Sequence, residues 1–468
     1  MNGAPAADGP AHVGLLRKEL PDAVLAPGDD GFDAACAGFQ TAYRHRPSAV
    51  VRADGSETVA AAVAHAADHG LSVAVQATGH GLSVPAEGGV LISTAGLRGV
   101  TVDAGARTAR IAPGTRFSEI IEAAARYGLA PLNGSAPDVG AVGYVLGGGL
   151  GLLGRQFGYA ADHVTSVDVV TADARVRHVT ADSDADLFWA LRGAGTNFGV
   201  VTGMEIGLVP VSRMYGGELV FDLARVPGIL EVYRQWTGTL PEELTSSVSL
   251  VAYPDLPMLP DRLRGRHLAQ VRIAYTGDSR RGEELTAPLR EAGPRQSDSV
   301  AEMPYTECGS IHDDPPLPHA YLGDNVLLRE FGAEDAAAVL RGAGPGSGVP
   351  CVVEIRHLGG ALGRAPLVPN AVGHRDAHYL LRTLTPLQFA DPDEARAAHR
   401  QLLGAVGGVR EASVGRFHNF VYGGCEDGGA HRPADDLWEP ADHGRLSELK
   451  AALDPANMFR CNRNVRLA

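Results

Sequence analysis

The feature that most constrains this chain is a glycine-rich segment at residues 133–164, which reads NGSAPDVGAVGYVLGGGLGLLGRQFGYAADHV. Glycine adopts positive φ angles easily, and its bare backbone lets peptide N–H groups approach a ligand closely. Such a segment can line a pyrophosphate, and a tightly packed structural turn would explain the glycines equally well. The glycines concerned are Gly147, Gly148, Gly149, Gly151 and Gly154.

Within this segment, residues 149–154 satisfy the GxGxxG pattern of dinucleotide-binding folds, and Asp168 stands near the expected acidic position. That pattern needs a strand before it and an amphipathic helix after it. Here the residues Gln156–Tyr159 interrupt any helix after the glycines. A nicotinamide-dependent reductase therefore stays open as a rival interpretation that the sequence does not favour, and NAD(P)H binding would test it.

Composition narrows the class of protein. The chain has 468 residues, which suggests two or three domains or subdomains, and its net charge is -14. An acidic chain without a dense basic run is a poor match for nucleic acid, which needs clustered cations. No stretch approaches the roughly 20 apolar residues of a membrane span, so we expect no membrane partner.

The cysteines and the N-terminus bear on the compartment. The five cysteines are widely spaced and form no CxxC pair, so we expect neither a disulfide framework nor a metal site. The sequence MNGAPAADGPAHVG has no basic stretch followed by an apolar run, so we predict no secretory signal and a cytoplasmic protein.

The hydrophobic pattern predicts short strands and alanine-rich helices before Pro210. We expect a helix over 57–69 capped by Ser56, a strand over 71–76, and a helix over 117–127 capped by Thr115. Residues 163–171 and 175–180 read as a hairpin. After Pro210 the sequence pattern changes, and longer candidate strands are separated by proline-rich loops. The expected strands there are 216–221, 247–253, 268–276, 351–358 and 377–385, and we expect a last helix at 443–453.

Taken together, five stretches resemble the berberine bridge enzyme-like oxidases of the vanillyl-alcohol oxidase and p-cresol methylhydroxylase flavoprotein superfamily. They occur in the family's order and span most of the chain, and the glycine-rich one is the most specific. The stretches are YRHRPSAVV at 43–51, VQATGHGLS at 75–83, residues 139–164, DLFWALRGAGTNFGVVT at 186–202, and RLSELKAALDPANMFRCNRNV at 445–465.

The resemblance implies an α+β fold with a split FAD-binding domain. Residues 1–210 and 413–468 would form the two-subdomain FAD-binding domain of the p-cresol methylhydroxylase type. Residues 211–412 would form a substrate domain, an antiparallel sheet covered by helices. The change of sequence pattern after Pro210 agrees with this division.

The resemblance also implies FAD with a single covalent link, from a ring nitrogen of His80 to the flavin 8α-methyl carbon. A loop histidine without a ligand role is the alternative. Gly147–Gly151 would lie near the pyrophosphate, Gly199–Val201 near the adenine, and the tail would close the site. The predicted cofactor contacts are Gln76, Ala77, Thr78, Gly79, His80, Gly81, Leu82, Val139, Gly140, Gly143, Tyr144, Gly147, Gly148, Gly149, Gly151, Asp162, Gly199, Val200, Val201, Asn419, Asn462 and Asn464.

Two positions depart from the family pattern. Ala136 occupies the place of the cysteine that forms a second flavin link in many members, with no thiol nearby in the sequence. Phe420 occupies the place of a tyrosine that helps deprotonate substrate, and phenylalanine cannot accept a proton. We therefore consider other candidate bases, each of which can equally be a structural polar residue: His357, Tyr379 and Tyr422, with His418 and Arg382 nearby.

The implied activity is an oxidase that passes a hydride from a substrate C–H bond to flavin N5 and then two electrons to O2. Only two lysines, Lys18 and Lys450, occur among 41 basic residues, which suggests a high-GC genome and natural-product, or antibiotic, tailoring. A rival is a resistance flavoprotein that sequesters or reoxidises a reduced antibiotic. A homodimer is compatible with the resemblance.

Overall fold

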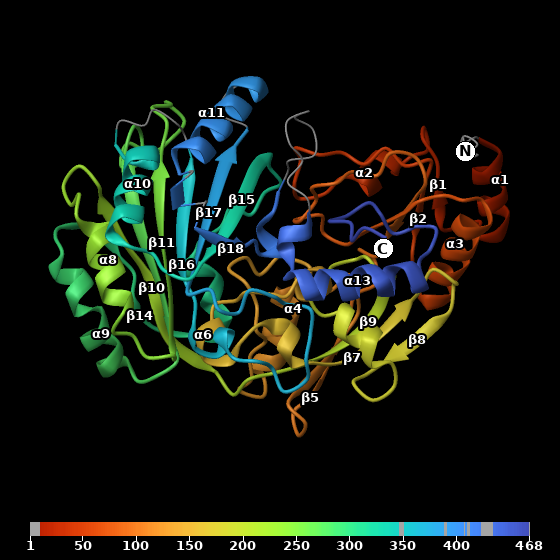
Figure 1. Ribbon diagram of the computed structural model, residues 1–468, viewed down its shortest axis with the longest axis horizontal. Coiled ribbons are helices and arrows are strands. Elements are labelled where there is room, and N and C mark those ends of the chain that lie inside the picture. The colour runs from red at the N-terminus through yellow and green to blue at the C-terminus, as the bar shows by residue number, and fades with distance from the viewer. Residues whose placement is uncertain are drawn as a thin grey trace.

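The computed structural model describes residues 10–345, 351–387, 391–406, 408–409, 412–422 and 434–467. Helices and mainly antiparallel sheets alternate along the chain, which confirms the predicted α+β class (Figure 1). Three sheets carry the architecture: one of four strands, one of five and one of nine. The nine-stranded sheet lies at one end of the long axis, and the four-stranded sheet lies at the other.

The four-stranded sheet has the order β1-β2-β4-β3, and its last three strands are parallel. Its helix α3 begins at Ser56 itself, and Gly55 holds the capping position, so Ser56 is not the N-cap that we predicted. The predicted strand over 71–76 begins at Val73. The elements are α1 (Pro10–Glu19), β1 (Val24–Leu25), α2 (Phe32–Cys36), β2 (Ala49–Arg52), α3 (Ser56–Asp68), β3 (Val73–Gln76) and β4 (Val90–Ser93).

The five-stranded antiparallel sheet has the order β5-β6-β9-β7-β8. The predicted hairpin is confirmed as β7 paired with β8. Helix α4 is present, but Arg116 and not Thr115 precedes it, and the Arg116 N–H donates to Glu119. The elements are β5 (Val100–Asp103), β6 (Thr108–Ile111), α4 (Phe117–Ala125), α5 (Ala141–Leu146), α6 (Gly154–Phe157), a 3₁₀ turn η1 (Ala160–His163), β7 (Val164–Val170), β8 (Val176–Val179), α7 (Ala185–Ala190) and β9 (Val200–Gly207).

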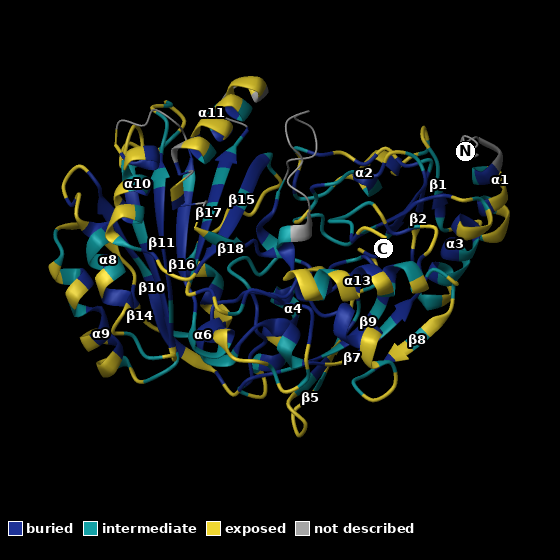
Figure 2. Cartoon of the chain, in the orientation of Figure 1, coloured by how far each residue is buried: buried dark blue, intermediate teal, exposed yellow. Residues whose placement is uncertain are grey.

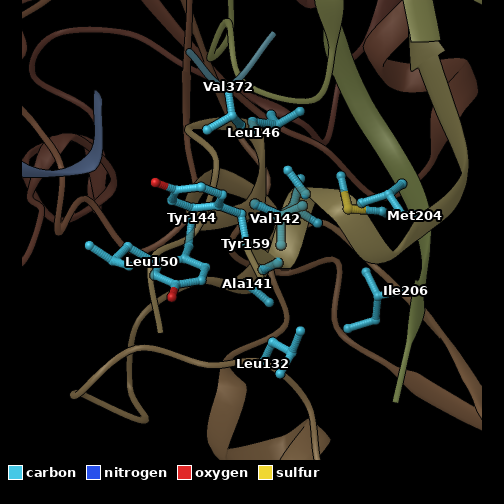
Figure 3. Close-up of a cluster of buried hydrophobic side chains, with 14 of the residues drawn as sticks. Leu132, Ala141, Val142, Tyr144, Leu146, Leu150, Tyr159, Met204, Ile206 and Val372 are labelled. Atoms are coloured by element: carbon cyan, nitrogen blue, oxygen red, sulfur yellow. The ribbon is translucent and has the colours of Figure 1, made fainter. Parts of the chain in front are cut away.

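A large apolar core joins this sheet to the glycine-rich segment. Figure 3 shows Tyr144 of α5 and Tyr159 within it, together with Leu132, Leu150 and Met204. Burying this much apolar surface fixes the glycine-rich segment against the sheet, so the segment is part of the scaffold and not a surface loop.

The nine-stranded antiparallel sheet has the order β13-β10-β12-β11-β16-β17-β15-β18, with β14 also pairing β10. All five strands predicted after Pro210 are confirmed. The strands are β10 (Arg213–Asp222), β11 (Leu244–Ala252), β12 (His267–Tyr275), β13 (Arg295–Asp298), β14 (Ala301–Pro304), β15 (Tyr321–Leu328), β16 (Val352–His357), β17 (Tyr379–Pro386) and β18 (Ser413–Gly415).

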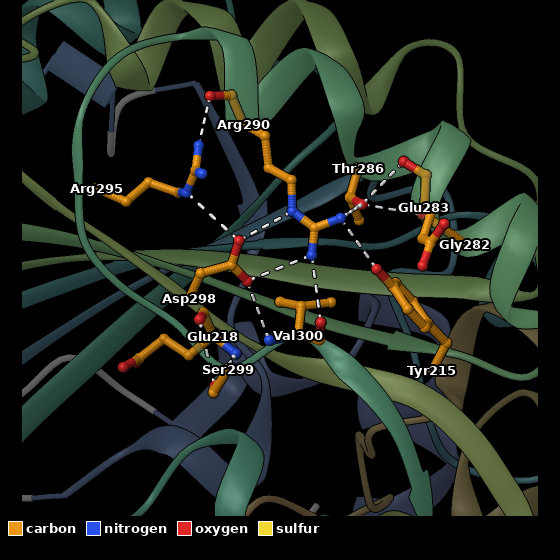
Figure 4. Close-up of polar contacts among 10 residues, drawn as sticks. All are labelled: Tyr215, Glu218, Gly282, Glu283, Thr286, Arg290, Arg295, Asp298, Ser299 and Val300. Carbon is orange, nitrogen blue, oxygen red and sulfur yellow. Dashed lines mark hydrogen bonds and ion pairs between the residues drawn. The ribbon is translucent and has the colours of Figure 1, made fainter.

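Helices cover one face of this sheet, as predicted, and their outward surfaces are exposed, whereas the central strands are largely buried (Figure 2). Arg290 ties one of them to the sheet edge, because it donates to Asp298, Tyr215 and the Val300 carbonyl (Figure 4). The helices are α8 (Ile229–Thr237), α9 (Ser279–Glu291), α10 (Ala333–Ala343) and α11 (Pro392–Ala405).

The uncovered face of the sheet meets the N-terminal half of the molecule. Along β16, Val353 and Ile355 pack under the helices, so Glu354 and Arg356 face the other way. Leu380 of β17 and Ala274 of β12 join the core cluster of the glycine-rich segment. The contact between the two halves therefore runs along this face.

The C-terminal stretch returns to the N-terminal half. The Val73 N–H donates to the Met458 carbonyl, and buried Lys450 donates to Asn197. The division at 210 and 412 stays our proposal, and β18 adds three residues beyond 412 to the large sheet. The remaining elements are 3₁₀ turns η2 (Tyr305–Ile311), η3 (Gly360–Gly363), η4 (His418–Phe420) and η5 (Ala434–Leu437), and helix α13 (Pro440–Leu453), which begins three residues before the predicted helix.

Candidate active site

The loop after β3 presents His80 against an aromatic ring. The imidazole stacks on Phe39 with ring centroids 3.9 Å apart, and its Nδ1 lies 2.9 Å from the Thr78 hydroxyl. Its Nε2 is buried without a hydrogen-bond partner among the described residues. Burial, helped by the charge of Arg116, lowers the pKa of His80 to about 4. His80 is therefore a neutral imidazole with one unused ring nitrogen.

The backbone around His80 accepts only glycine at one position. Gly79 has a φ of 69°, and a Cβ there would lie 2.5 Å from the Gly38 Cα. Gln76 holds the same neighbourhood, because its amide donates to the Ala37 carbonyl and its Oε1 accepts from His45. The close approach of two backbone segments thus sets where His80 points.

Thr78 connects this loop to the start of α5. Its hydroxyl accepts a hydrogen bond of 3.2 Å from the Gly140 N–H, while Val139 accepts from Phe117. Further along α5, a Cβ on Gly143 would meet nothing within 4 Å, and the Tyr144 hydroxyl is buried without a partner among the described residues. The predicted contacts Ala77–Leu82 and Val139–Tyr144 therefore lie together around open space and unpaired polar atoms.

Asn419 holds the glycine turn from the opposite side. Its Oδ1 accepts from the Gly149 N–H at 3.0 Å, and its Nδ2 donates to the Tyr144 carbonyl at 3.1 Å. A Cβ on Gly147 would lie 2.6 Å from this Nδ2. The Gly148 N–H donates to the Val145 carbonyl. In this conformation the amides of Gly148 and Gly149 are used within the protein, so they are not free pyrophosphate donors.

The GxGxxG pattern does not open a helix of the dinucleotide-binding kind. Helix α6 has four residues and stops at Gly158, whose φ is 88°. Gly151 instead packs on Asn133, since a Cβ there would lie 2.5 Å from the Asn133 carbonyl oxygen. The interruption predicted at Gln156–Tyr159 is confirmed.

Of the other predicted cofactor contacts, some are already engaged by protein groups. Asp162 accepts from Arg375 at 2.6 Å and from Asn370 at 2.7 Å. Val200 and Val201 are buried strand residues of β9, and a Cβ on Gly199 would lie 2.4 Å from the Val170 carbonyl oxygen. These four positions shape the scaffold in this conformation.

Asn462 and Asn464 in the C-terminal tail keep side-chain oxygens that no protein group in the described part of the chain uses. The amide of Asn462 donates to the Thr196 carbonyl at 3.0 Å, but its Oδ1 is buried without a partner among the described residues. The Oδ1 of Asn464 is also buried without a hydrogen-bond partner among the described residues. A bound FAD could supply hydrogen-bond partners for the unpaired oxygens of the tail and for the Nε2 of His80, and the space beside Gly143 is open. The described residues are therefore compatible with the cofactor.

The uncovered face of the large sheet carries a charged cluster that sequence reasoning largely missed. Glu354 of β16 accepts from Arg356 at 3.0 Å and lies 3.8 Å from Arg382 of β17. The two guanidinium groups lie over the ring of Phe420, at 4.8 and 5.2 Å from its centroid. Charged residues alternating with Val353 and Ile355 were the available signal.

Glu354 is ionised in this cluster. Burial opposes its charge, but Arg356 and Arg382 hold the pKa of the carboxyl well below its usual range. A carboxylate with so low a pKa is a weak proton acceptor. The cluster therefore supplies fixed charge and not a general base.

The three predicted bases take different places. His357 accepts at Nε2 from Arg155 at 2.9 Å, and since a guanidinium only donates, the proton of the neutral ring is on Nδ1. Burial, helped by Arg155, lowers the pKa of His357 to about 3. Tyr379 bonds to Thr237 at 2.8 Å on the helix-covered side, away from the cluster.

Tyr422 lies beside Tyr321, with ring centroids 5.2 Å apart, and Tyr321 donates to the His80 carbonyl at 2.8 Å. Burial raises the pKa of Tyr422, although Arg382 and Arg356 oppose the shift. His418, next to Asn419, has its pKa lowered to about 4 by burial, with Arg463 contributing. Tyr321 thus connects Tyr422 to the backbone of His80.

A small cavity of about 30 Å³ lies between the glycine turn and the uncovered sheet face. Its walls come from the turn, from β11, β12 and β16, and from η2. The lining residues are Leu150, Gly151, Leu152, Thr245, Ser246, Ser247, Arg272, Ile273, Ala274, Ile311, His312, Arg356, His357 and Leu358. Its position makes it the candidate substrate chamber.

The structure qualifies the statement that no thiol lies near Ala136. Cys308 of η2 is fully buried, and the Asn133 amide lies 3.5 Å from its sulfur. Burial raises the pKa of Cys308 to about 11, so it is a protonated core residue. Among the described residues, no group of three or more metal-ligating side chains occurs, and no helix is long and apolar enough to cross a membrane.

Comparison with known proteins adds independent information. Residues 47–180 match the family model described as FAD binding domain. The chain is 29% identical over 458 residues to (R)-6-hydroxynicotine oxidase of Paenarthrobacter nicotinovorans, covering 94% of this chain and 96% of that protein.

Solved structures agree. The crystal structure of 6-hydroxy-D-nicotine oxidase from Arthrobacter nicotinovorans is 27% identical, with a TM-score of 0.80, and covers 94% of this chain and 97% of its own. BBE-like 1 of Physcomitrella patens shares the fold, with a TM-score of 0.82 at 18% identity over 97% of this chain and 99% of its own.

Proposed function

Because this chain belongs to the FAD-linked, berberine bridge enzyme-like oxidases of the vanillyl-alcohol oxidase superfamily, we propose that it oxidises a small organic molecule with FAD linked covalently through His80. The bound cofactor supplies the redox chemistry, taking a hydride from a substrate C–H bond and passing two electrons to O2. The protein's part is to position the substrate in the chamber and keep water out.

The observation that carries the covalent link is the state of His80. Its ring is neutral, because burial and Arg116 lower its pKa to about 4, and its Nε2 has no partner among the described residues. A neutral imidazole nitrogen is nucleophilic. Linking it to the 8α carbon removes one hydrogen from nitrogen and one from carbon, and O2 accepts both with two electrons to give hydrogen peroxide.

Acid precipitation tests the link. We expect the flavin colour of purified protein to stay in the precipitate of the wild type and to move to the supernatant in His80→Ala. His45→Ala is the matched control, because His45 is buried in the same region but is bonded to Gln76 and Ala86. Covalent flavin that persists in His80→Ala would refute the link while leaving FAD binding intact.

The biological setting that we propose is natural-product tailoring, supported only by the lysine-poor composition. A second function, binding or reoxidation of a reduced antibiotic, is favoured by Phe420, whose ring contacts the guanidinium groups of Arg356 and Arg382 and stands where the family pattern has a tyrosine. Reoxidising a hydroquinone needs no strong base. Oxygen consumption with turnover supports the first function, and tight binding without turnover supports the second.

A further inference from the structure

The ring of His80 is held on its face and at one of its two nitrogens. The imidazole stacks on Phe39 with ring centroids 3.9 Å apart and an interplanar angle of 12°. The Phe39 N–H donates to the Thr78 carbonyl at 2.9 Å, so this stacking partner is tied to the loop that carries His80. The Tyr321 hydroxyl in turn donates to the His80 carbonyl at 2.8 Å. These contacts fix the plane and the position of the ring by protein groups alone.

The side chain of Thr78 engages the Nδ1 atom of that ring. Its hydroxyl oxygen lies 2.9 Å from Nδ1 and accepts a hydrogen bond of 3.2 Å from the Gly140 N–H. Because an amide N–H only donates, the hydroxyl keeps one lone pair and its own proton for Nδ1. It can therefore accept from a protonated Nδ1 or donate to a bare one. The Nε2 of His80 is buried without a partner among the described residues, so it is the nitrogen left to bond a carbon atom.

Both abilities of the hydroxyl are used when a carbon atom is bonded to the ring. A neutral imidazole carries one proton, and Nε2 has a free lone pair only while that proton is on Nδ1, where it donates to Thr78. Once Nε2 is bonded to carbon, the neutral ring keeps its one lone pair on Nδ1, which accepts from the same hydroxyl. A methyl group in place of the hydroxyl does neither.

We propose that Thr78 is a positioning residue that directs the covalent flavin link to the Nε2 atom of His80. The inference deepens the proposed function and rests on it. In the link a bond forms between Nε2 and the flavin 8α carbon. The ring loses its Nδ1 proton, the carbon loses one proton and two electrons, and O2 takes up all of these to give hydrogen peroxide.

NMR on the flavin peptide, released from purified holoprotein by proteolysis, identifies the linked nitrogen directly. In the ring, Nε2 is bonded to Cε1 and Cδ2, whereas Nδ1 is bonded to Cε1 and Cγ. Long-range proton–carbon correlations from the 8α methylene group therefore reach two hydrogen-bearing carbons in an Nε2 link. In an Nδ1 link they reach Cγ, which bears no hydrogen. We expect the wild type to give the Nε2 isomer alone.

Substitutions at Thr78 test its role. Thr78→Val keeps the shape and removes the hydroxyl, so Nδ1 is no longer held, and we expect the Nδ1 isomer to reach about a tenth or more of the linked flavin. Thr78→Ser keeps the hydroxyl and should give the Nε2 isomer alone. Thr94→Val is the matched control and should do the same, because the buried Thr94 hydroxyl donates to the Gln76 carbonyl, just before the loop.

Four results would overturn the inference: an Nδ1 link in the wild type, the Nε2 isomer alone in Thr78→Val, an Nδ1 isomer in Thr78→Ser as abundant as in Thr78→Val, or the same change in Thr94→Val. Thermal unfolding reports on folding, and if Thr78→Val does not fold, Thr78→Ala takes its place. Acid precipitation of the wild type separates the two proposals. Flavin entirely in the supernatant would contradict the covalent link and this inference together, whereas flavin linked through Nδ1 would leave the link and remove only the role of Thr78.

Discussion

Arg155 offers the sharpest test of how the two halves of the molecule are joined. It follows the glycine turn on α6, is 5% exposed and reaches across to the end of the large sheet. Its Nε donates to the Leu244 carbonyl and its Nη1 to His357 Nε2, both at 2.9 Å, and Nη1 also donates to the Leu358 carbonyl. Replacing it with methionine keeps the stem and removes every donor.

The expected cost follows from the groups left behind. Three buried acceptors lose their partner, and each unsatisfied buried group costs about 1–3 kcal/mol. Removing a buried charge returns several kcal/mol of desolvation. The net loss should be about 2–4 kcal/mol in the free energy of unfolding. Arg364→Met is the control, because Arg364 is exposed and bonds Glu242 at the surface, where the effect should stay within about 0.5 kcal/mol.

The pH dependence gives a signature that a general loss of packing would not. Burial and Arg155 lower the pKa of His357 from 6.5 to about 3. The unfolded chain therefore binds a proton that the folded protein refuses, and stability is lost as pH falls from about 6.5 towards 3. In Arg155→Met the charge of Arg155 no longer lowers the pKa of His357, so this pKa rises. The pH range over which His357 reduces the stability of the folded protein is therefore narrower. The difference between wild type and variant should shrink as the solution is acidified.

Urea unfolding followed by tryptophan fluorescence, at about pH 7 and about pH 4, measures both effects, because the two proteins diverge only as the pH falls through the folded pKa of His357 in the variant. A destabilisation below about 1 kcal/mol at neutral pH would refute the assignment of Arg155 as the joint between the halves. A difference that does not change with pH would refute its contact with His357.

Two further predictions concern the cofactor loop and the tail. Gly79→Ala should cost about 2–4 kcal/mol and reduce flavin content, because of its positive φ and the 2.5 Å approach to Gly38, while Gly228→Ala, with a φ of -86° and open space around its Cβ, should be tolerated. Lys450→Met should cost about 3–5 kcal/mol in urea unfolding, because it leaves Asp454 buried and without its cation at 2.7 Å, whereas the exposed Lys18→Met should be neutral.

Local patterns predicted much of the fold. The helix α3, the hairpin β7–β8 and the strands after Pro210 all carry their signals within a few residues, and all are present. The errors at Ser56 and Thr115 have one origin, since a cap depends on backbone geometry and on competing partners. Thr115 bonds to Gly99 across 16 positions, which no local pattern contains.

Strand β15 was missed for a related reason. Its sequence YLGDNVLL carries Asp324 and Asn325, which local rules associate with turns. In the structure Asn325 is fully buried, and its amide bonds both the N–H and the carbonyl of Phe417. A partner 92 residues away makes a polar residue acceptable inside a strand.

The sequence likewise predicted one part of the candidate site and missed another. The loop at His80 was predicted from its resemblance to a family, and the structure adds what the sequence lacked, namely Phe39 and Thr78 as neighbours of the ring. Glu354 and Arg356 were missed as a pair, because their significance lies in Arg382 and Phe420 from other strands and turns. Chemistry that arises from tertiary contacts cannot be obtained from spacing.

These contacts lead to a last prediction about the reaction itself. The pKa of His357 is lowered to about 3 and the pKa values of His80 and His418 to about 4, while the pKa of Tyr422 is raised above its ordinary 10. Each imidazole is therefore already neutral, and the phenol still protonated, throughout the range from about pH 5 to about 9. For a substrate that does not ionise in this range, the rate of flavin reduction in anaerobic stopped-flow experiments should be independent of pH. An inflection near pH 6.5 that disappears in His357→Gln would show instead that His357 titrates in the working enzyme and acts as the base.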